Sequence, residues 1–291
     1  MAPLCTGAHR AGTYPVRMRI ATVNVNGIRA AARKGMAAWL EASAPDVLLL
    51  QEVRADADTA AALLPGYRSL VRPSRIRGRA GVGVAVREDG PLTLGRARYG
   101  VADGAEEPDV DSGRWLEALV EADGAPSPVR LVSAYFHSGE KDTPKQEAKM
   151  AHLPRIGARM AELLASAASG GEQAVVCGDF NVVRSRADIK NWTSNHNKRA
   201  GVLDEEIAFL NGWVREGWRD VVRDLAGQVQ GPYSWWTWRG QAFDNDAGWR
   251  LDYQFATPGL ARAARSFTIG RAPSYDQRFS AHAPVGVVYG L

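Results

Sequence analysis

Cysteine and long apolar runs are scarce in this chain of 291 residues. One of its two cysteines, Cys5, lies in the N-terminal tail, and the other, Cys177, lies in an apolar run that predicts a buried strand. This usage argues against a disulfide framework and fits a reducing compartment, so we expect a cytoplasmic protein. No apolar run approaches the roughly 18 residues that cross a membrane, so we expect no membrane partner.

Several common catalytic motifs are also missing. The chain has no GxxxxGK[ST] phosphate loop, no GxSxG nucleophile elbow and no HExxH zinc pair. These absences argue against a P-loop nucleotide hydrolase, a serine hydrolase of that type and a zincin protease. The first 17 residues lack the apolar segment of a secretory signal, and Met18 is an alternative start.

The composition is that of a globular protein with a slight basic excess. Hydrophobic residues make up 45% of the chain, and the formal net charge is +4. A modest positive charge is compatible with a nucleic-acid partner but does not establish one. Tryptophan is more distinctive, because four of the nine tryptophans fall between Trp235 and Trp249.

The order of apolar runs predicts one α/β domain, with two packed mixed β-sheets flanked by helices. We expect residues 1–17 to form a flexible extension and residues 18–291 to form the single catalytic domain. The expected strands, separated by turn-forming residues, are 19–25, 47–50, 80–86, 114–120, 129–136, 174–177, 233–238, 249–256, 267–270 and 285–289. The strands at 114–120 and 129–136 flank a Gly/Pro-rich turn and predict a hairpin.

Two helices have clear boundaries. Thr143-Pro144 opens the first, with Gln146 where a capping-box partner belongs, and Gly170-Gly171 ends it. Pro154 lies inside this stretch, so we expect a kink or a late start. The second helix is predicted over residues 203–213.

Polar residues follow the apolar runs at six places. The residues concerned are Asn24 and Asn26, Glu52, Tyr135, Asp179 and Asn181, Asp252, and His282, which precedes the last strand. Each alone is explained by a turn or a solvated side chain. Together, if the strands lie side by side, their ends would form one anionic pocket suited to Mg²⁺. Carboxylates and amides with one histidine and no nucleophile motif favour metal-assisted hydrolysis of a phosphate ester.

An ordered set of motifs resembles the exonuclease III family of apurinic/apyrimidinic (AP) endonucleases. The motifs are NVNGIRA from Asn24, LQE ending at Glu52, SAYF around Tyr135, GDFN at Asp179–Asn181, WRLDY around Asp252 and HAP from His282. The resemblance runs from about Met18 to the C-terminus. It implies a four-layer α/β sandwich that hydrolyses DNA with Mg²⁺, or with Mn²⁺ as a substitute.

The resemblance also implies roles for individual residues. Glu52, with Asn26 nearby, would hold the metal ion, with Asp179, Asn181 and His282 as further candidate ligands. Asp179 would orient or deprotonate water, and Asn181 would position it. His282 would donate to a phosphate oxygen and Asp252 would fix its tautomer. Tyr135 would contact the phosphate or assist the leaving oxygen, and Asn24 would hold Asp179 or the phosphate.

Two further segments favour a DNA-repair enzyme within this resemblance. Trp235, Trp249 and Leu251 match the family's pocket for a flipped-out abasic deoxyribose, although buried core packing is the alternative. The loop after Asn181 carries the candidate DNA contacts Lys190, Asn191, Lys198 and Arg199, although a solvated basic loop is the alternative. Arg239 is a further candidate DNA contact. Arg72, Arg75, Arg77 and Arg79 form a weaker second candidate. The expected partner is double-stranded DNA with abasic sites or 3′ ends, bound by a monomer.

Two positions depart from the family pattern. Relatives have aspartate before the last histidine, where this chain has Ala281. The position is open to three explanations: an engineered knock-down, a natural loss of activity, or compensation by another carboxylate. We favour the first, because the other motifs are intact, and expect weakened metal binding or turnover with DNA binding kept. The second departure is His137, where proline is usual. Contact with the DNA backbone is one explanation, and a loop histidine without a role is the favoured one.

Three hypotheses for function therefore stay open. The leading one is an AP endonuclease that cleaves 5′ to abasic sites and also has 3′–5′ exonuclease or 3′-phosphodiesterase activity. The second is a phosphodiesterase of the same superfamily for another phosphate ester. The third, which Ala281 keeps open, is a catalytically weak protein that binds abasic DNA.

Overall fold

The computed structural model describes residues 17–102, 107–122 and 127–291. The expected extension, Cys5 and the turn around Gly124 lie wholly or largely outside these ranges. Arg17, which we assigned to the extension, belongs instead to the first strand, where it pairs with Gly290.

Two six-stranded mixed sheets form the centre of the molecule, as predicted. The first holds, in spatial order, β11 (Ala264–Ile269), β12 (Val285–Gly290), β1 (Arg17–Asn24), β2 (Val47–Gln51), β4 (Val82–Arg87) and β3 (Tyr67–Arg72). The second holds β5 (Leu92–Tyr99), β6 (Trp115–Ala122), β7 (Val129–Tyr135), β8 (Gln173–Asp179), β10 (Asp252–Ala256) and β9 (Arg219–Asp220). The expected hairpin is confirmed, since β6 and β7 pair antiparallel.

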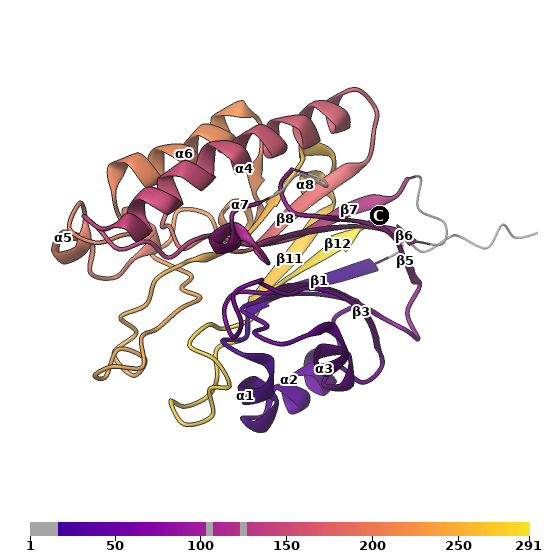
Figure 1. Cartoon of the computed structure of the whole chain (residues 1–291), viewed down its shortest axis with the longest axis horizontal. Helices are drawn as coiled ribbons and strands as arrows, with labels where there is room; N and C mark the ends of the chain where they lie inside the picture. The colour runs from indigo at the N-terminus through magenta and orange to yellow at the C-terminus, as the bar shows by residue number, and fades with distance from the viewer. Residues whose placement is uncertain (1–16, 103–106, 123–126) are drawn as a thin grey trace, which may run out of the picture.

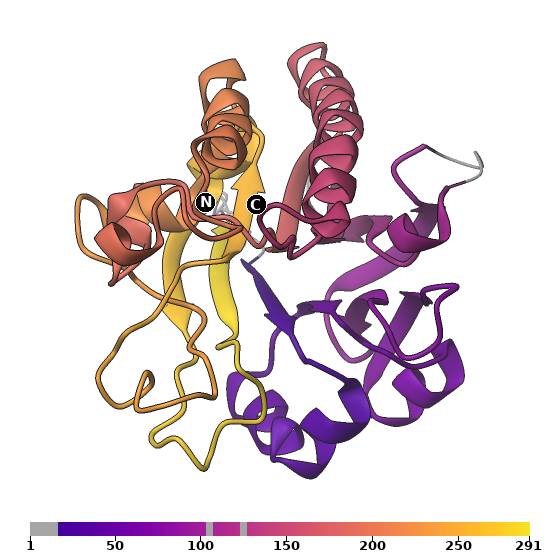
Figure 2. The ribbon, with the colours of Figure 1, turned by 60° about the vertical axis from the view of Figure 1, so that its left-hand side comes forward.

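The helices cover the outer faces of the sheets and complete a four-layer sandwich (Figures 1 and 2). Against the first sheet lie α1 (Ile28–Arg33), α2 (Met36–Ser43) and α3 (Ala57–Ala62). Against the second lie α4 (Pro144–Ala168) and α6 (Asp204–Glu216). The shorter elements are α5 (Trp192–Asn195), α7 (Val221–Ala226), α8 (Pro258–Ala263) and two 3₁₀ turns, η1 (Asp109–Asp111) and η2 (Arg186–Asp188).

The apolar runs become buried strands because both of their faces are covered. Between the sheets, Leu49 of the first packs in one core with Leu131 and Val175 of the second. Burial of such side chains contributes roughly 25 cal/mol per Å² of apolar surface, which is the main term that holds the layers together. Cys177 is buried in this core, as expected for a small strand residue.

Helix α4 begins at Pro144, so the late start that we considered for it is wrong. The helix continues through Pro154 to Ala168, and Ser169 and Gly170 follow it. One proline removes a single backbone donor, whereas the apolar stripe of α4 packs over a long stretch of β8. Gln146 does not complete a capping box, because its side chain donates instead to Glu206 Oε1 at 2.9 Å.

The expected strand 233–238 does not form, and the strand expected from Trp249 begins only at Asp252. In this region only isolated bridges occur, which join Trp235 to Trp249 and to His282. The hydroxyl of Ser234 accepts from the amides of Leu251 and Asp252, both at 3.0 Å. This side-chain bonding replaces a regular ladder. The aromatic residues here therefore serve as a packed corner rather than as a strand.

Candidate functional site

The polar strand ends converge at one edge of the two sheets. Strand β1 runs parallel to β2 with Asn24 opposite Gln51, and β7 runs parallel to β8 with Tyr135 opposite Asp179. The antiparallel β10 begins there too, with Asp252 opposite Asp179. Parallel neighbours end at the same edge of a sheet. The gathering of strand ends that the sequence pattern suggested is therefore what the structure shows.

The pocket at this edge has a volume of about 650 Å³. Three kinds of residue line it: acidic and polar groups from the strand ends, aromatic residues from the corner, and basic loop residues. The lining includes Glu52, Arg54, Tyr135, Lys141, Asp179, Asn181, Lys198, Arg199, Trp235, Trp249, Leu251 and His282.

Asn24 joins the two sheets at the floor of the pocket. Its Nδ2 donates to Glu52 Oε1 at 2.8 Å and to Asp179 Oδ2 at 2.9 Å. Its Oδ1 accepts the backbone N–H of Asn26 at 2.9 Å. A buried amide with three satisfied bonds fixes two carboxylates from different sheets relative to each other.

The backbone leaves the strands in strained conformations at this floor. Asn26, Glu52 and Asn181 have φ of 49°, 50° and 50°. A left-handed φ costs a non-glycine residue on the order of 1 kcal/mol, and three such residues lie together at this floor. Gly178, one residue before Asp179, permits the close pairing of β7 and β8, because a Cβ there would lie 1.9 Å from Ala134 O.

His282 and Asp252 form a buried pair beside Asp179. His282 Nδ1 lies 2.9 Å from Asp252 Oδ2, and its Nε2 lies 3.7 Å from Asp179 Oδ2. Ser234 Oγ also donates to Asp252 Oδ2, at 2.6 Å. With Nδ1 held as the donor to Asp252, Nε2 is the ring nitrogen left to face the pocket.

The two sides of this pair have displaced pKa values. Burial opposes the charged imidazolium, but Asp252 and Asp179 outweigh it and raise the pKa of His282 to about 9. Burial, helped by Asp252 and Glu52 and opposed by His282, raises the pKa of Asp179 to about 7. At neutral pH the histidine is therefore a proton donor, while Asp179 is poised to accept a proton.

Tyr135 and Glu52 complete the acidic side. Burial, and then Glu52 and Asp179, hold the pKa of Tyr135 well above its usual value, so the hydroxyl stays neutral. Arg114 lies under its ring at 4.9 Å. Burial raises the pKa of Glu52, but Arg54 and the Asn24 hydrogen bond prevail and lower it. Glu52 is thus a carboxylate, ion-paired with Arg54.

The donor set fits a divalent metal ion. Glu52, Asp179 and Asn181 present oxygen donors to the pocket, and Asp252 Oδ1 is buried without a hydrogen-bond partner among the described residues. One ligand atom each from Asp179, Asp252 and His282 falls within 4.8 Å of the others. Burial and the neighbouring carboxylates raise the pKa of Asp179. A bound cation would relieve the repulsion between these carboxylates. Binding at Glu52 requires Arg54 to release one of its oxygens.

Trp235, Trp249 and Leu251 lie directly beside these groups. The two indoles meet edge to face, with centroids 5.6 Å apart, and Trp235 lies 6.5 Å from the imidazole of His282. Lys198 and Arg199 line the pocket from the loop that follows β8. Buried Lys149 supports that loop, because it pairs with Glu206 at 2.7 Å, and Glu206 accepts the backbone N–H of Gly201.

Six candidates from the sequence do not line the pocket: Asn24, Asn26, Lys190, Asn191, Arg239 and Asp252. Lys190, Asn191 and Arg239 are exposed, and Asn26 is half-buried. Asp252 is fully buried, and its Oδ2 contacts His282 Nδ1 at 2.9 Å. Of the arginine cluster, Arg75, Arg77 and Arg79 line a neighbouring pocket that shares Arg54 with this one, whereas Arg72 does not.

Several contributing residues were not identified from the sequence. Arg54 and Lys141 line the pocket, Arg114 supports Tyr135, and Ser234 holds Asp252. Arg250 anchors the tryptophan corner by pairing with Asp188 and Asp220 at 2.7 and 2.8 Å. Of these residues, only Arg54 could have been recognised from the sequence, because it lies two positions after Glu52 and follows the same strand.

One small cavity borders Ala281, and its described lining holds no acidic side chain. Ala281 is buried, and its carbonyl accepts the N–H of Trp236 at 3.1 Å. The small cavity beside it is lined, within the described part of the chain, by apolar residues, Ser280, His282 and Arg278, with no acidic side chain. The three explanations of Ala281 therefore all stay open.

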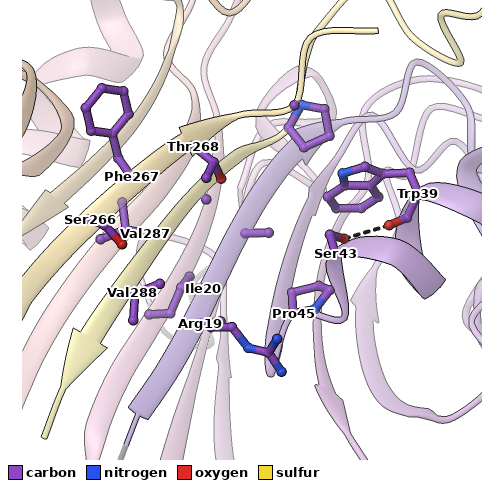
Figure 3. Close-up of a pocket in the computed structure, with 14 residues that line it drawn as sticks. Arg19, Ile20, Trp39, Ser43, Pro45, Ser266, Phe267, Thr268, Val287 and Val288 are labelled. Atoms are coloured by element: carbon purple, nitrogen blue, oxygen red, sulfur yellow. Dashed lines mark hydrogen bonds between the residues drawn. The ribbon is translucent and has the colours of Figure 1, made fainter. Parts of the chain in front are cut away.

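A separate pocket of about 210 Å³ lies between α2 and the strands β1, β12 and β11. Figure 3 shows Trp39 and Pro45 on one side of it and the strand residues Thr268 and Val288 on the other. Its single charged lining residue is Arg19, which pairs with Asp46 at 3.1 Å. This apolar pocket has no group for phosphate chemistry, so the site is the pocket at the strand ends. No helix in the described ranges has the length and apolar content that crossing a membrane requires.

A model of the Endonuclease/Exonuclease/phosphatase family matches residues 21–282. The chain belongs to this family. An exodeoxyribonuclease from Bacillus subtilis (strain 168) is 27% identical over 276 residues, which cover 94% of this chain and 100% of the relative. A DNA-(apurinic or apyrimidinic site) endonuclease from Dictyostelium discoideum is 25% identical over 280 residues, which cover 94% of this chain and 71% of the relative.

Solved structures agree on the fold. An AP endonuclease from Leishmania major superposes with a TM-score of 0.79 at 23% identity, covering 94% of this chain and 88% of that one. A 3′–5′ exonuclease from Neisseria meningitidis gives 0.77 at 24% identity, with 94% and 100% covered. With the family match and the named relatives, these results confirm the resemblance to exonuclease III-like AP endonucleases and identify the chain as an enzyme of the nuclease type.

Proposed function

We propose that this chain is a Mg²⁺-dependent DNA-repair phosphodiesterase that cleaves 5′ to abasic sites and trims 3′ ends of double-stranded DNA. The observation that carries the proposal is the shared pocket. Glu52, Asp179 and His282, which suit phosphate hydrolysis, line it together with Trp235 and Trp249, which suit an extrahelical sugar. The names of the relatives from Bacillus subtilis and Dictyostelium discoideum support the same class of reaction and substrate.

Asp179 and Asn181 would handle the attacking water. Asn181 Nδ2 donates to Phe136 O at 3.0 Å and to Asp179 Oδ2 at 3.2 Å, which leaves its Oδ1 to accept from water. Asp179, with its pKa near 7, takes the proton as water attacks phosphorus. The bond from phosphorus to the 3′-oxygen breaks, and the products are a 3′-hydroxyl and a 5′-phosphate.

His282 and Tyr135 would act on the phosphate. His282 Nε2–H donates to a non-bridging oxygen and stabilises the negative charge that develops there. The neutral hydroxyl of Tyr135 donates to the phosphate or to the leaving oxygen. A bound Mg²⁺, held by Glu52, would supply Lewis-acid stabilisation of the phosphate charge. Manganese offers similar chemistry at the same oxygen donors.

Substrate choice would come from the tryptophan corner. Flipping a nucleotide out of a duplex costs a few kcal/mol, and least where no base is present. Trp235, Trp249 and Leu251 form an apolar wall beside the catalytic groups. Lys198 and Arg199 would neutralise the flanking phosphates, which predicts a strong dependence on salt.

The test is cleavage of one duplex with a single abasic site, followed on a gel with Mg²⁺ and with EDTA. The proposal predicts one incision 5′ to the site, loss of cleavage in EDTA, and slower shortening of the 3′ end. Binding of the abasic duplex without cleavage in Mg²⁺ or Mn²⁺ would support the catalytically weak binding protein that Ala281 leaves open. Activity restricted to other phosphate esters would overturn the proposal.

A further inference from the structure

A second buried cluster of metal-type side chains lies apart from the catalytic pocket. It consists of Asp111 at the end of η1, His137 just after β7, and His152 on α4. One ligand atom from each lies within 4.8 Å of the other two. None of the three lines the catalytic pocket.

His152 is the residue that fold stability alone does not explain. It is 2% exposed, and both of its ring nitrogens lack a hydrogen-bond partner among the described residues. Leaving a buried polar group unpaired is destabilising, so a native chain seldom keeps one without a partner. Its ring meets that of His137 edge to face, with centroids 5.3 Å apart.

The other two residues are already arranged as ligands. His137 Nε2 lies 2.7 Å from Asp111 Oδ1. Two ligand atoms on one tetrahedral zinc ion are about 3.3 Å apart, given bond lengths of about 2 Å. An ion between these atoms therefore needs only a small separation of this pair and a modest side-chain movement of His152.

The cationic residues nearby have partners of their own. Arg155 binds the outer oxygen of Asp111, Oδ2, at 3.0 Å and leaves Oδ1 to the histidines. Arg114 donates to Val110 O at 2.8 Å and stacks on Tyr135. Burial lowers the pKa of both histidines, that of His152 to about 4, and the neutral imidazole is the form that coordinates a metal.

We infer that Asp111, His137 and His152 form a structural site for a transition-metal ion of the zinc class, separate from the catalytic metal. Two imidazoles and one carboxylate suit Zn²⁺, Co²⁺ or Fe²⁺ and suit Mg²⁺ poorly. The ion would tie the η1 turn to β7 and α4.

The test compares the chelator-treated full chain with two variants. His152→Phe keeps a ring of similar size but removes the ligand, and Glu52→Gln changes the catalytic site instead. Equilibrium dialysis against Zn²⁺ with metal analysis counts the ions, Co²⁺ absorbance reports coordination by nitrogen, and thermal unfolding reports stabilisation.

We expect the chain and Glu52→Gln to bind one tight Zn²⁺ that His152→Phe binds at least about tenfold more weakly. Zn²⁺ should raise the unfolding midpoint of the first two by several degrees but not that of His152→Phe. Asp111→Asn, which retains the hydrogen bond to His137, should lose the same ion. Equal Zn²⁺ binding by the chain and His152→Phe would overturn the inference, whatever the outcome of the cleavage assay.

Discussion

Two buried clusters of aspartate and histidine in this chain differ in the charge of their imidazoles. Beside the catalytic pocket, His282 faces Asp252 and Asp179, and its pKa rises to about 9. In the second cluster, His152 shares the single carboxylate of Asp111 with His137 and Arg155, and its pKa falls to about 4. Burial disfavours the charged imidazole in both. The number of carboxylates for each imidazole therefore decides which cluster donates protons and which suits a metal ion.

The largest effect should follow from removing the base of the catalytic cluster. Asp179→Asn should slow single-turnover cleavage of an abasic duplex by about 10²–10⁴-fold, because the amide cannot accept a proton from water. His152→Phe is the matched control and should remain within about twofold of the unaltered chain. A loss in His152→Phe as large as that in Asp179→Asn would show that the two clusters do not act separately.

A gain is expected where the catalytic cluster lacks a carboxylate. Ala281→Asp should raise Mg²⁺-dependent cleavage by about 10- to 100-fold, measured as turnover across a Mg²⁺ titration. Ala281→Asn, of the same size but without charge, is the control and should give little gain. No improvement with aspartate would show that the pocket already holds its metal ion fully.

The pH dependence of cleavage tests the charge states of Asp179 and His282. Cleavage should rise as Asp179 loses its proton near pH 7 and fall as His282 loses its proton near pH 9. Asp252→Asn removes the main group that raises the pKa of His282, so the alkaline limb should move down by about one unit or more. Ser234→Ala, which removes one hydrogen bond to Asp252, should move the limb less. An unchanged limb in Asp252→Asn would assign it to another group.

A smaller loss is expected from the aromatic wall. Trp249→Ala should weaken binding of an abasic duplex by at least about fivefold, since one stacking contact contributes roughly 1–3 kcal/mol. Lys198→Ala should instead remove about one phosphate contact and so lower the salt dependence of binding. It should weaken binding of abasic and intact duplexes equally. Equal losses on abasic and intact duplexes for Trp249→Ala would remove this residue from lesion recognition.

The smallest effect concerns stability without metal. His152→Phe removes two buried nitrogens without partners, so the metal-free variant should gain about 1 kcal/mol in free energy of unfolding. Urea denaturation in the presence of EDTA measures this. A destabilised variant would mean that the two nitrogens are satisfied by bound water instead.

The sandwich fold was predictable because buried strands appear as continuous apolar runs. Residues 47–50, 129–136 and 174–177 were recognised in this way, and β2, β7 and β8 contain or closely match them. The edge strands β3 and β5 were missed because they are partly exposed and carry arginine and threonine among apolar residues. The short helices α1 to α3 were missed because alanine-rich segments of six to eight residues have little helical periodicity.

The proposed catalytic residues could be recognised in the sequence because each follows or precedes an apolar run. Such a run predicts a strand, and the residues at its end lie at an edge of the sheet. From order and residue type alone followed the α/β class, the group of polar strand ends and the unusual alanine before His282. The three-dimensional fold decided everything that depends on distance. It paired Asn24 with Glu52 and Asp179 across two sheets, assigned opposite pKa shifts to His282 and His152, and brought His152 beside Asp111. Electrostatic interactions and metal coordination act over a few ångströms. Asp111 and His152, which are 41 positions apart in the sequence, reach that range only after folding.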